Sequence, residues 1–301
     1  MSKAPHSSTP LSARLKVLAA GALFSSGGAL VKSVSLTGWQ VASFRSGIAA
    51  VALLLLMPEA RRRPNLKVLL VGVAYATTMI QFVLSNKLTT AASAIFLQAA
   101  APLYVLFLSP WLLKERVRPR DLVYMAALGL GLGLCFTGLD PVSATAPNPL
   151  LGNFLALLSG IFWALTIMGL RALGRGAAEE GGSWGPAAAV WGNVFAFGMC
   201  LPLALPVVSS RPGDWLLMGF LGVFQIAVAY VFLLRGLEHV RALEGSLLLL
   251  SEPVLNPVWA WLVHGERPGA WSLAGGAVIL LSTVVKGWVD SREEEPVTAP
   301  P

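Results

Sequence analysis

The chain has 301 residues, of which 55% are hydrophobic and only 12% are charged. Soluble domains carry roughly twice that charged fraction, so the composition excludes a soluble globular protein and indicates an integral membrane protein. A net charge of +7 in such a protein is expected to set its topology. Binding of nucleic acid is not expected, because the basic residues are not gathered on a folded polar domain.

Ten apolar segments are long enough to cross a bilayer. They cover residues 15–33, 38–57, 66–86, 90–113, 121–139, 150–171, 187–208, 215–236, 242–263 and 270–288. Residues 140–149 (DPVSATAPNP) are expected to link two halves of five spans each. The acidic, proline-ended tail at 291–301 is predicted to be disordered.

The distribution of Lys and Arg predicts that both termini are cytoplasmic. If the N-terminus lies inside, the outer connections hold only Lys32, Lys87, Arg211 and Arg267. Arg45 lies within the second span, and the other 17 of the 22 basic residues lie inside. A bias of this size is typical of the positive-inside rule.

Two stretches of the chain, 91–116 and 242–267, repeat one pattern at an offset of 151 residues. Pro102 matches Pro253, Glu115 matches Glu266 and Arg116 matches Arg267. A second match, at an offset of 139, relates Gly21, Phe24 and Lys32 to Gly160, Trp163 and Arg171. Such matches without gaps indicate a duplication.

An odd number of spans in each half requires the second half to cross the membrane in the opposite sense. The predicted fold is therefore an all-α membrane protein of ten transmembrane helices, arranged as two inverted five-helix repeats. The repeats cover residues 1–146 and 147–290, and the tail covers 291–301. Gly129 and Gly133 form a GxxxG motif in the fifth span, which predicts close helix packing there.

Pro102 and Pro253 lie near the midpoints of the fourth and ninth spans. Each proline removes a backbone hydrogen bond and frees the carbonyl four residues earlier, on Gln98 and Leu249 respectively. Inside a bilayer this is tolerated where protein or a wet cavity satisfies the freed group. Paired interrupted helices are typical of transporter binding sites, and simple packing kinks are the alternative.

A central cavity is predicted near these prolines, because polar groups at mid-depth must face protein or water. Residues related by the repeat should meet across its axis, Met79 with Tyr230 and Phe24 with Trp163. Gln98 would orient the polar end of a substrate, and Trp163 would stack on a ring. The alternative for each residue is ordinary helix packing. The expected substrate-binding residues are Tyr75, Met79, Gln98, Trp163, Tyr230, Ser251, Phe24 and Gln225.

Glu252 is the one acidic residue expected near the bilayer centre. An intramembrane carboxylate indicates function by default, but a structural hydrogen bond or pairing is the favoured role here, with proton coupling as the alternative. Arg45 could extend to the interface, gate the outer mouth or hold Glu252. We therefore group Glu252 and Arg45 with Pro102 and Pro253 as structural or coupling residues.

No catalytic residue, metal site or cofactor is predicted. Cys135 and Cys200 lie within apolar segments and are expected to pack as small side chains. His6, His239 and His264 lack the spacing of metal ligands.

With these residues in hand, the chain resembles the drug/metabolite transporter superfamily, specifically its ten-helix EamA-type exporters. The resemblance extends from about residue 15 to 288 and is carried by the pairs Pro102–Glu115 and Pro253–Glu266, together with Glu252 and Arg45. It implies a multi-pass transporter of the bacterial inner membrane, most similar to exporters of aromatic amino acids. One departure is Ala101, where the second half has Glu252.

These features favour a secondary transporter that exports small neutral metabolites, above all aromatic and other neutral amino acids, by alternating access. It would work as uniporter or proton-coupled carrier, and as a monomer whose partners are the bilayer and a small-molecule substrate. An exchanger of phosphorylated solutes or nucleotide sugars would need several central cations, and only Arg45 is available. An intramembrane enzyme would need a pair of catalytic groups at mid-depth, and none is evident. A channel remains a further alternative.

Overall fold

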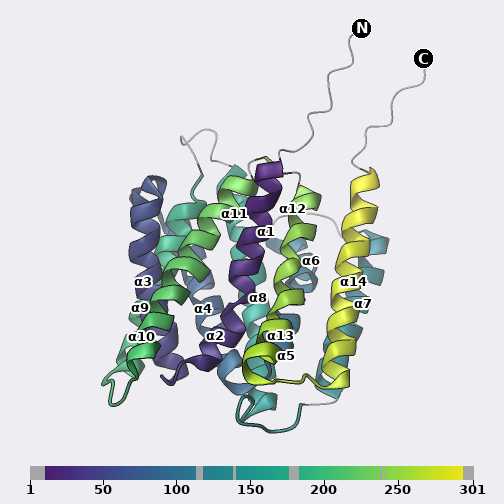
Figure 1. The fold of residues 1–301 in the computed structure, drawn as a ribbon. Helices are drawn as coiled ribbons and strands as arrows, with labels where there is room; N and C mark the ends of the chain where they lie inside the picture. The colour runs from purple at the N-terminus through teal and green to yellow at the C-terminus, as the bar shows by residue number, and fades with distance from the viewer. Residues whose placement is uncertain are drawn as a thin grey trace, which may run out of the picture.

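The computed structural model describes residues 11–112, 118–137, 140–175, 183–237, 239–240 and 242–293. These residues form a bundle of helices without a β-strand among them; their one isolated β-bridge joins Ser143 to Ala146. Figure 1 shows the helices running side by side, with the first residues of α1 and the last residues of α14 at the same end of the bundle. The fold class is therefore all-α, as predicted.

The helices have the following bounds: α1 Leu11–Ser25, α2 Gly27–Ser33, α3 Gly38–Leu56, α4 Leu66–Leu88, α5 Ala91–Ala99, α6 Ala101–Leu112, α7 Pro119–Thr137, α8 Pro149–Arg175, α9 Gly185–Ala204, α10 Pro212–Phe220, α11 Ala229–Leu237, α12 Ala242–Leu249, α13 Ser251–His264 and α14 Ala270–Glu293. A 3₁₀ turn, η1, covers Pro58–Arg61, and a π-helical stretch, η2, covers Leu221–Val228 between α10 and α11.

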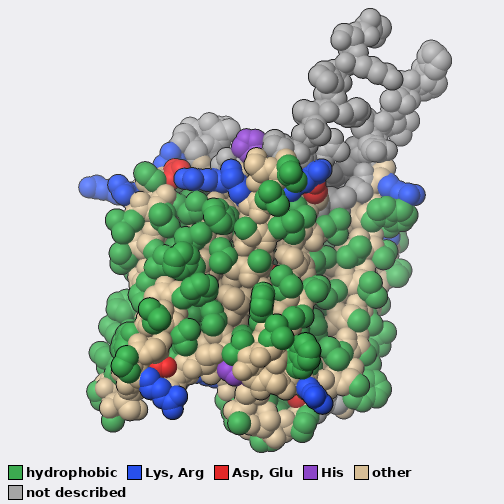
Figure 2. All heavy atoms as spheres, in the orientation of Figure 1, with side chains coloured by type: hydrophobic (Ala, Val, Ile, Leu, Met, Phe, Trp, Pro, Cys, Tyr) green, Lys and Arg blue, Asp and Glu red, His purple; other side chains and the backbone are tan. Residues whose placement is uncertain are grey.

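Nine helical stretches of the described chain are long and apolar enough to cross a membrane. They are α1–α2, α3, α4, α5–α6, α7, α8, α9, α10–η2–α11 and α14. The stretch α12–α13 runs end to end but carries Glu244, Glu252 and Asn256, which lower its hydropathy. Figure 2 shows hydrophobic side chains around the middle of the bundle and Lys and Arg side chains at both ends. The protein is thus a multi-pass membrane protein.

Two spans are interrupted beside the matched prolines. The fourth predicted span divides into α5 and α6 at Ala100, and the ninth divides into α12 and α13 at Leu250. The prediction placed the bends at Pro102 and Pro253, whereas the breaks fall two and three residues before them. A proline blocks the helical hydrogen bond of its own nitrogen and crowds the preceding turn, so the irregular residue lies upstream.

Glycines let a straight helix approach each broken span. A methyl group at Gly160 of α8 would lie 3.1 Å from the Leu97 carbonyl oxygen of α5. On the other side of the bundle, a methyl group at Gly21 of α1 would collide with the Ser251 hydroxyl of α13. Helix α8 therefore packs on α5 and α6, and α1 packs on α12 and α13.

The predicted GxxxG packing in α7 is wrong in register. A side-chain methyl at Gly129 or Gly133 would meet nothing within 4 Å. The close approach to α14 is instead at Gly131, where the added methyl would lie 2.9 Å from the Gly275 carbonyl oxygen. The glycine-rich helix does pack closely on α14, but through Gly131, which lies between the two glycines of the motif.

The segment 140–149 lies between α7 and α8, and its first residue, Asp140, is buried with 4% of its surface exposed. One prediction about a terminal segment needs correction. The C-terminal tail was expected to be disordered from residue 291, whereas α14 continues to Glu293. The remainder of that tail, 294–301, lies outside the described residues, as do residues 1–10 and the predicted motif residues Glu115 and Arg116.

Candidate functional site

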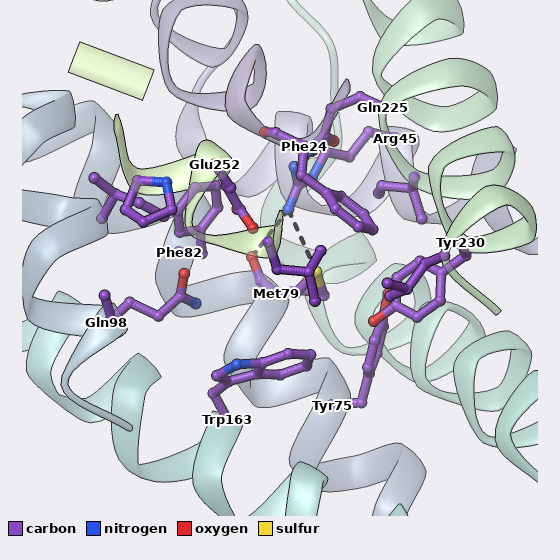
Figure 3. A pocket seen from close by; sticks show the side chains of 16 residues that line it. Phe24, Arg45, Tyr75, Met79, Phe82, Gln98, Trp163, Gln225, Tyr230 and Glu252 are labelled. Atoms are coloured by element: carbon purple, nitrogen blue, oxygen red, sulfur yellow. Dashed lines mark hydrogen bonds between the residues drawn. The ribbon is translucent and has the colours of Figure 1, made fainter. Parts of the chain in front are cut away.

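A cavity of about 160 Å³ lies between the two interrupted spans and the helices around them. It is lined by Phe24, Arg45, Tyr75, Met79, Phe82, Ile95, Gln98, Ala99, Trp163, Gln225, Ile226, Tyr230, Leu233, Leu249, Glu252 and Pro253. Figure 3 shows their side chains converging from helices that are distant in the sequence. The third, fourth, sixth, eighth and ninth predicted spans were expected to line the cavity, and all five contribute to it. Helices α1 and α3 add Phe24 and Arg45.

One wall of the cavity is aromatic. The Tyr230 ring lies edge-on to the Phe24 ring at a centroid distance of 5.5 Å and to the Tyr75 ring at 5.8 Å. The Tyr75 hydroxyl accepts a hydrogen bond of 3.4 Å from the Asn193 amide of α9, which holds that ring in place. Edge-on pairs of this kind are favourable for aromatic rings, so the wall is preformed.

Trp163 approaches the cavity from α8 and lines it apart from this aromatic cluster (Figure 3). The sequence predicted that Phe24 and Trp163, which match in the repeat, would converge on one volume. Both do line the cavity, but the ring partner of Phe24 is Tyr230. Trp163 therefore keeps a ring face for other contacts.

Arg45 of α3 is completely buried and lines the same cavity. Its Nη2 donates to the Met79 carbonyl oxygen at 3.3 Å and contacts the Met79 sulfur at 3.9 Å (Figure 3). Its Nη1 donates to the Gln225 Oε1 at 3.5 Å, and its Nε has no hydrogen-bond partner. The side chain thus does not extend to the membrane surface, which excludes one of the three predicted roles.

Gln225 reaches Arg45 because of the π-helical stretch η2, in which the backbone turn is wider than in an α-helix. Such stretches are rare and occur frequently at functional sites. Gly222 in the same stretch lies against the Arg45 carbonyl oxygen, where a methyl group would come within 2.8 Å. The sequence predicted Gln225 as a lining residue, but nothing in the sequence indicated the π-helix that directs it.

Gln98 is the second-last residue of α5, just before the break at Ala100. Its Nε2 donates to the Ser159 Oγ of α8 at 2.7 Å, and the Ser159 hydroxyl in turn donates to the Thr78 carbonyl oxygen at 3.3 Å. The amide is therefore fixed by α8 while it lines the cavity. For Gln98, a hydrogen bond between helices thus coexists with a position on the cavity.

Glu252 lies in the first turn of α13 and lines the cavity beside Pro253. No hydrogen bond or ion pair of Glu252 occurs within the described part of the chain. The predicted pairing with Arg45 is therefore wrong as a direct contact. Glu252 and Arg45 are the two charged side chains among the described residues that line the cavity.

Every predicted site residue lines this cavity except Ser251 and Pro102. Ser251 was expected to reach it, but its hydroxyl faces Gly21 of α1, because the turn begun at Leu250 rotates it away from its neighbour Glu252. The lining residues that the sequence did not indicate are Phe82, Ile95, Ala99, Ile226, Leu233 and Leu249. All six are apolar and cannot be told from packing residues in a membrane helix by type alone.

Metal ligation has no support in the described residues, which contain no group of three His, Cys, Asp or Glu side chains able to hold an ion. Cys135 and Cys200 are free and buried, in keeping with their predicted packing role. The cavity therefore offers aromatic faces, two amides and two opposite charges as its means of binding.

Comparison with known families decides the class of the protein. The model of the EamA-like transporter family matches residues 11–137 and again residues 150–286. The chain belongs to the EamA-like transporter family. The predicted resemblance to this family is thus confirmed, and the two matches fall on the two halves of the chain.

Several relatives of this EamA-family chain have names of transporters or exporters. The pseudopaline exporter CntI of Pseudomonas aeruginosa is 29% identical over 275 residues, which cover 87% of this chain and 90% of that protein. An uncharacterized transporter of Archaeoglobus fulgidus is 27% identical over 225 residues, covering 74% and 77%. A protein crystal structure with 20% identity superposes with a TM-score of 0.62 over 94% of this chain and 99% of that one, which shows a shared fold.

Proposed function

We propose that this EamA-family transporter is a secondary carrier that exports small neutral metabolites, most of all aromatic and other neutral amino acids. The observation that carries the proposal is the cavity between the two interrupted spans, with its aromatic wall and few polar groups. Its volume of about 160 Å³ is below the roughly 300–1,000 Å³ of sites for drug-sized ligands, which favours a small substrate. A relative named as a pseudopaline exporter supports the direction of transport.

The proposed architecture has ten spans in two inverted repeats, with α12–α13 as the ninth span. Support comes from the two matches to one family model and from the breaks at Ala100 and Leu250. The packing is also reciprocal, because α1 of the first half packs on the broken span of the second, and α8 does the converse. The excess of Lys and Arg in the N-terminal side connections favours cytoplasmic termini in a bacterial inner membrane.

Transport would follow alternating access, in which the two halves rock about the cavity. The interrupted spans provide irregular backbone next to the cavity, where a change of helix direction needs the fewest hydrogen bonds to break. Glu252 is the candidate for proton coupling, and uniport is the alternative. The proposed functional unit is a monomer.

Exchange of phosphorylated solutes or nucleotide sugars is the second candidate and is disfavoured. Such substrates carry two or more negative charges and would need several cations. Among the described lining residues Arg45 is the single cation, and Glu252 contributes an opposing negative charge. An intramembrane enzyme is disfavoured by the transporter relatives.

The test is flux of radiolabelled amino acids from liposomes that contain the purified protein, with and without a pH gradient. We expect efflux of phenylalanine and of a small neutral amino acid such as alanine. Trp163→Ala should weaken phenylalanine transport by roughly 0.5–1.5 kcal/mol more than alanine transport, because a stacking partner is lost. Equal flux in empty liposomes, or no flux of any amino acid, would contradict the proposal.

Orientation can be checked in the same liposomes. Single cysteines at Arg267 and Arg118 should be labelled by a membrane-impermeant thiol reagent from opposite sides, after Cys135 and Cys200 are replaced. Labelling of both positions from one side would rule out the inverted repeat.

A further inference from the structure

Arg45 carries a buried positive charge that no described carboxylate neutralises. The guanidinium is completely buried, yet the described residues offer it no carboxylate within ion-pair distance. Its partners are a carbonyl oxygen at 3.3 Å, an amide oxygen at 3.5 Å and a sulfur at 3.9 Å, all of them neutral. A buried charge without a counterion is costly, so such a group is expected to meet an anion during its function.

The geometry of these contacts leaves room for that anion. A guanidinium has five N–H donors in a planar fork that matches the two oxygens of a carboxylate. The three contacts above are long or involve sulfur, and the Nε donor has no partner. Figure 3 shows the end of the Arg45 side chain directed into the cavity. An anionic group entering the cavity could therefore replace weak contacts by a bidentate pair.

Glu252 presents the complementary problem on the same cavity. Its carboxylate belongs to α13, on the opposite half of the chain from Arg45, and has no hydrogen bond or ion pair within the described residues. The two side chains remain more than ion-pair distance apart, although both line the cavity (Figure 3). A ligand with one positive and one negative group could bridge them, where a direct salt bridge does not form.

We infer that Arg45 binds the carboxylate of the substrate and Glu252 binds its ammonium group, so that the cavity selects zwitterionic α-amino acids over molecules with only one of these groups. This inference rests on the proposed function and specifies its recognition. The aromatic wall of Phe24, Tyr75 and Tyr230 then faces the substrate side chain. Gln98 is left as a neutral contact, because its amide nitrogen already donates to Ser159.

Other charge classes fit this pair of groups less well. A phosphate would meet one guanidinium and a repelling carboxylate, and an amine without a carboxylate would leave Arg45 unpaired. A site built with polar groups for a substrate rejects analogues that lack the matching group, because its own groups are then buried unpaired. Arg45 and Glu252 should therefore disfavour ligands that lack one of the two charged groups, as well as attract ligands that have both.

The experiment compares three probes of one shape: phenylalanine, phenethylamine, which lacks the carboxylate, and 3-phenylpropionate, which lacks the amine. Each probe competes with labelled phenylalanine in counterflow by the parent protein in liposomes, and each is also tested by its shift of the thermal unfolding midpoint in detergent. For the parent we expect phenylalanine to compete at least ten times better than either analogue.

Each variant should remove the preference for one of the two charged groups of phenylalanine. Arg45→Gln should remove the advantage of phenylalanine over phenethylamine, and Glu252→Gln should remove its advantage over 3-phenylpropionate. Arg45→Lys keeps the charge without the fork and should give an intermediate loss for the carboxylate. Ser43→Ala is the matched control on α3, because the Ser43 hydroxyl bonds to the Phe197 carbonyl oxygen away from the cavity.

The outcomes separate the inference from the function on which it rests. If the parent transports and binds phenylalanine but both Gln variants keep its preference order, the inference is overturned and the proposed function stands. If none of the three probes binds or is transported by the parent, the proposed function fails as well. If Arg45→Gln does not fold, the effects of Arg45→Lys and Glu252→Gln on the preference order still decide the question.

Discussion

Lys32 and Arg45 both have buried, positively charged side chains, but within the described chain only Lys32 has an ion-pair partner. Lys32 lies in the last turn of α2 and forms an ion pair with Glu266 at 3.1 Å, with 3% of each side chain exposed. Its Nζ also donates to the carbonyl oxygens of Thr89, at 2.6 Å, and Thr145. Arg45 has no ion-pair partner among the described residues and makes only long contacts with neutral atoms.

The Lys32 site is part of a closed polar network at one end of the bundle. Glu266, which follows α13, accepts a hydrogen bond from the Ala91 N–H at the start of α5. Next to it, Asp140 accepts from the Thr90 and Ser93 hydroxyls at 2.7 and 2.8 Å and from the Gly269 N–H at 2.6 Å. The network joins the start of α5 to the start of α14, and its charges are paired within the protein: the one contact of the buried Glu266 Oε2 is the Lys32 ammonium, without a hydrogen bond of its own.

The difference separates structural charge from recognition charge. A network that satisfies all its members holds helix ends together and does not need a ligand. A buried charge that lacks a counterion indicates a group that binds a ligand rather than one that stabilises the fold. The polar network contains residues from both predicted halves, Lys32 from the first and Glu266 from the second, and it therefore also holds the two halves together at that end.

The largest expected effect comes from breaking the Lys32–Glu266 pair. Lys32→Met leaves the Glu266 carboxylate buried without its cation and should lower the free energy of unfolding by about 3–5 kcal/mol. The double variant Lys32→Met, Glu266→Gln removes both charges and should recover part of that loss. Unfolding of the purified protein in detergent, by heat or denaturant, measures both. A double variant no more stable than Lys32→Met would contradict the pairing.

A smaller effect is expected at Asp140. Asp140→Asn keeps the shape of the side chain but removes the charge that the Thr90, Ser93 and Ser272 hydroxyls and the Gly269 N–H share. Hydrogen bonds to charged groups contribute about 1.5–3 kcal/mol each. We expect a loss of about that size in the same unfolding assay. Asp290→Asn is the control, because the Asp290 side chain is partly exposed and its ion pairs with Arg120 and Lys286 lie outside the network. An equal loss in both variants would mean that the buried Asp140 contributes no more to the free energy of unfolding than the partly exposed Asp290.

The sequence predicted the cavity better than it predicted the network. Offsets between the halves and the cost of polar groups at mid-depth were enough to bring Tyr75, Met79, Gln98 and Tyr230 to one place. These arguments work because a bilayer penalises every polar side chain that does not face protein or water. The role of Asp140, in contrast, depends on a loop folding back onto two helix starts, which no periodic pattern encodes.

Local backbone geometry explains the remaining errors. Ser251 and Glu252 are neighbours, and only the break at Leu250 decides which of them faces the cavity. The π-helical stretch at Leu221–Val228 shifts the register of α11 relative to α10 by part of a turn, and it directs Gln225 toward Arg45. Neither feature has a sequence signal as strong as proline, so Ser251 was placed on the wrong face, whereas Gln225 was correctly predicted to line the cavity without any sign of the π-helix that directs it.

The smallest expected change in stability is also the sharpest test of the comparison. Arg45→Met removes a buried charge that has no charged partner to leave behind, and replacing buried ionic groups by apolar ones of similar volume is often neutral or stabilising. We therefore expect the free energy of unfolding to stay within about 1 kcal/mol of the parent, whereas Lys32→Met falls by several times that amount. Gln225 keeps a partner in the variant, because its Nε2 donates to the Phe24 carbonyl oxygen at 3.4 Å. The two methionine variants are measured side by side in detergent without substrate. If Arg45→Met is as unstable as Lys32→Met, Arg45 is a structural residue like Lys32, and the distinction between the two sites fails.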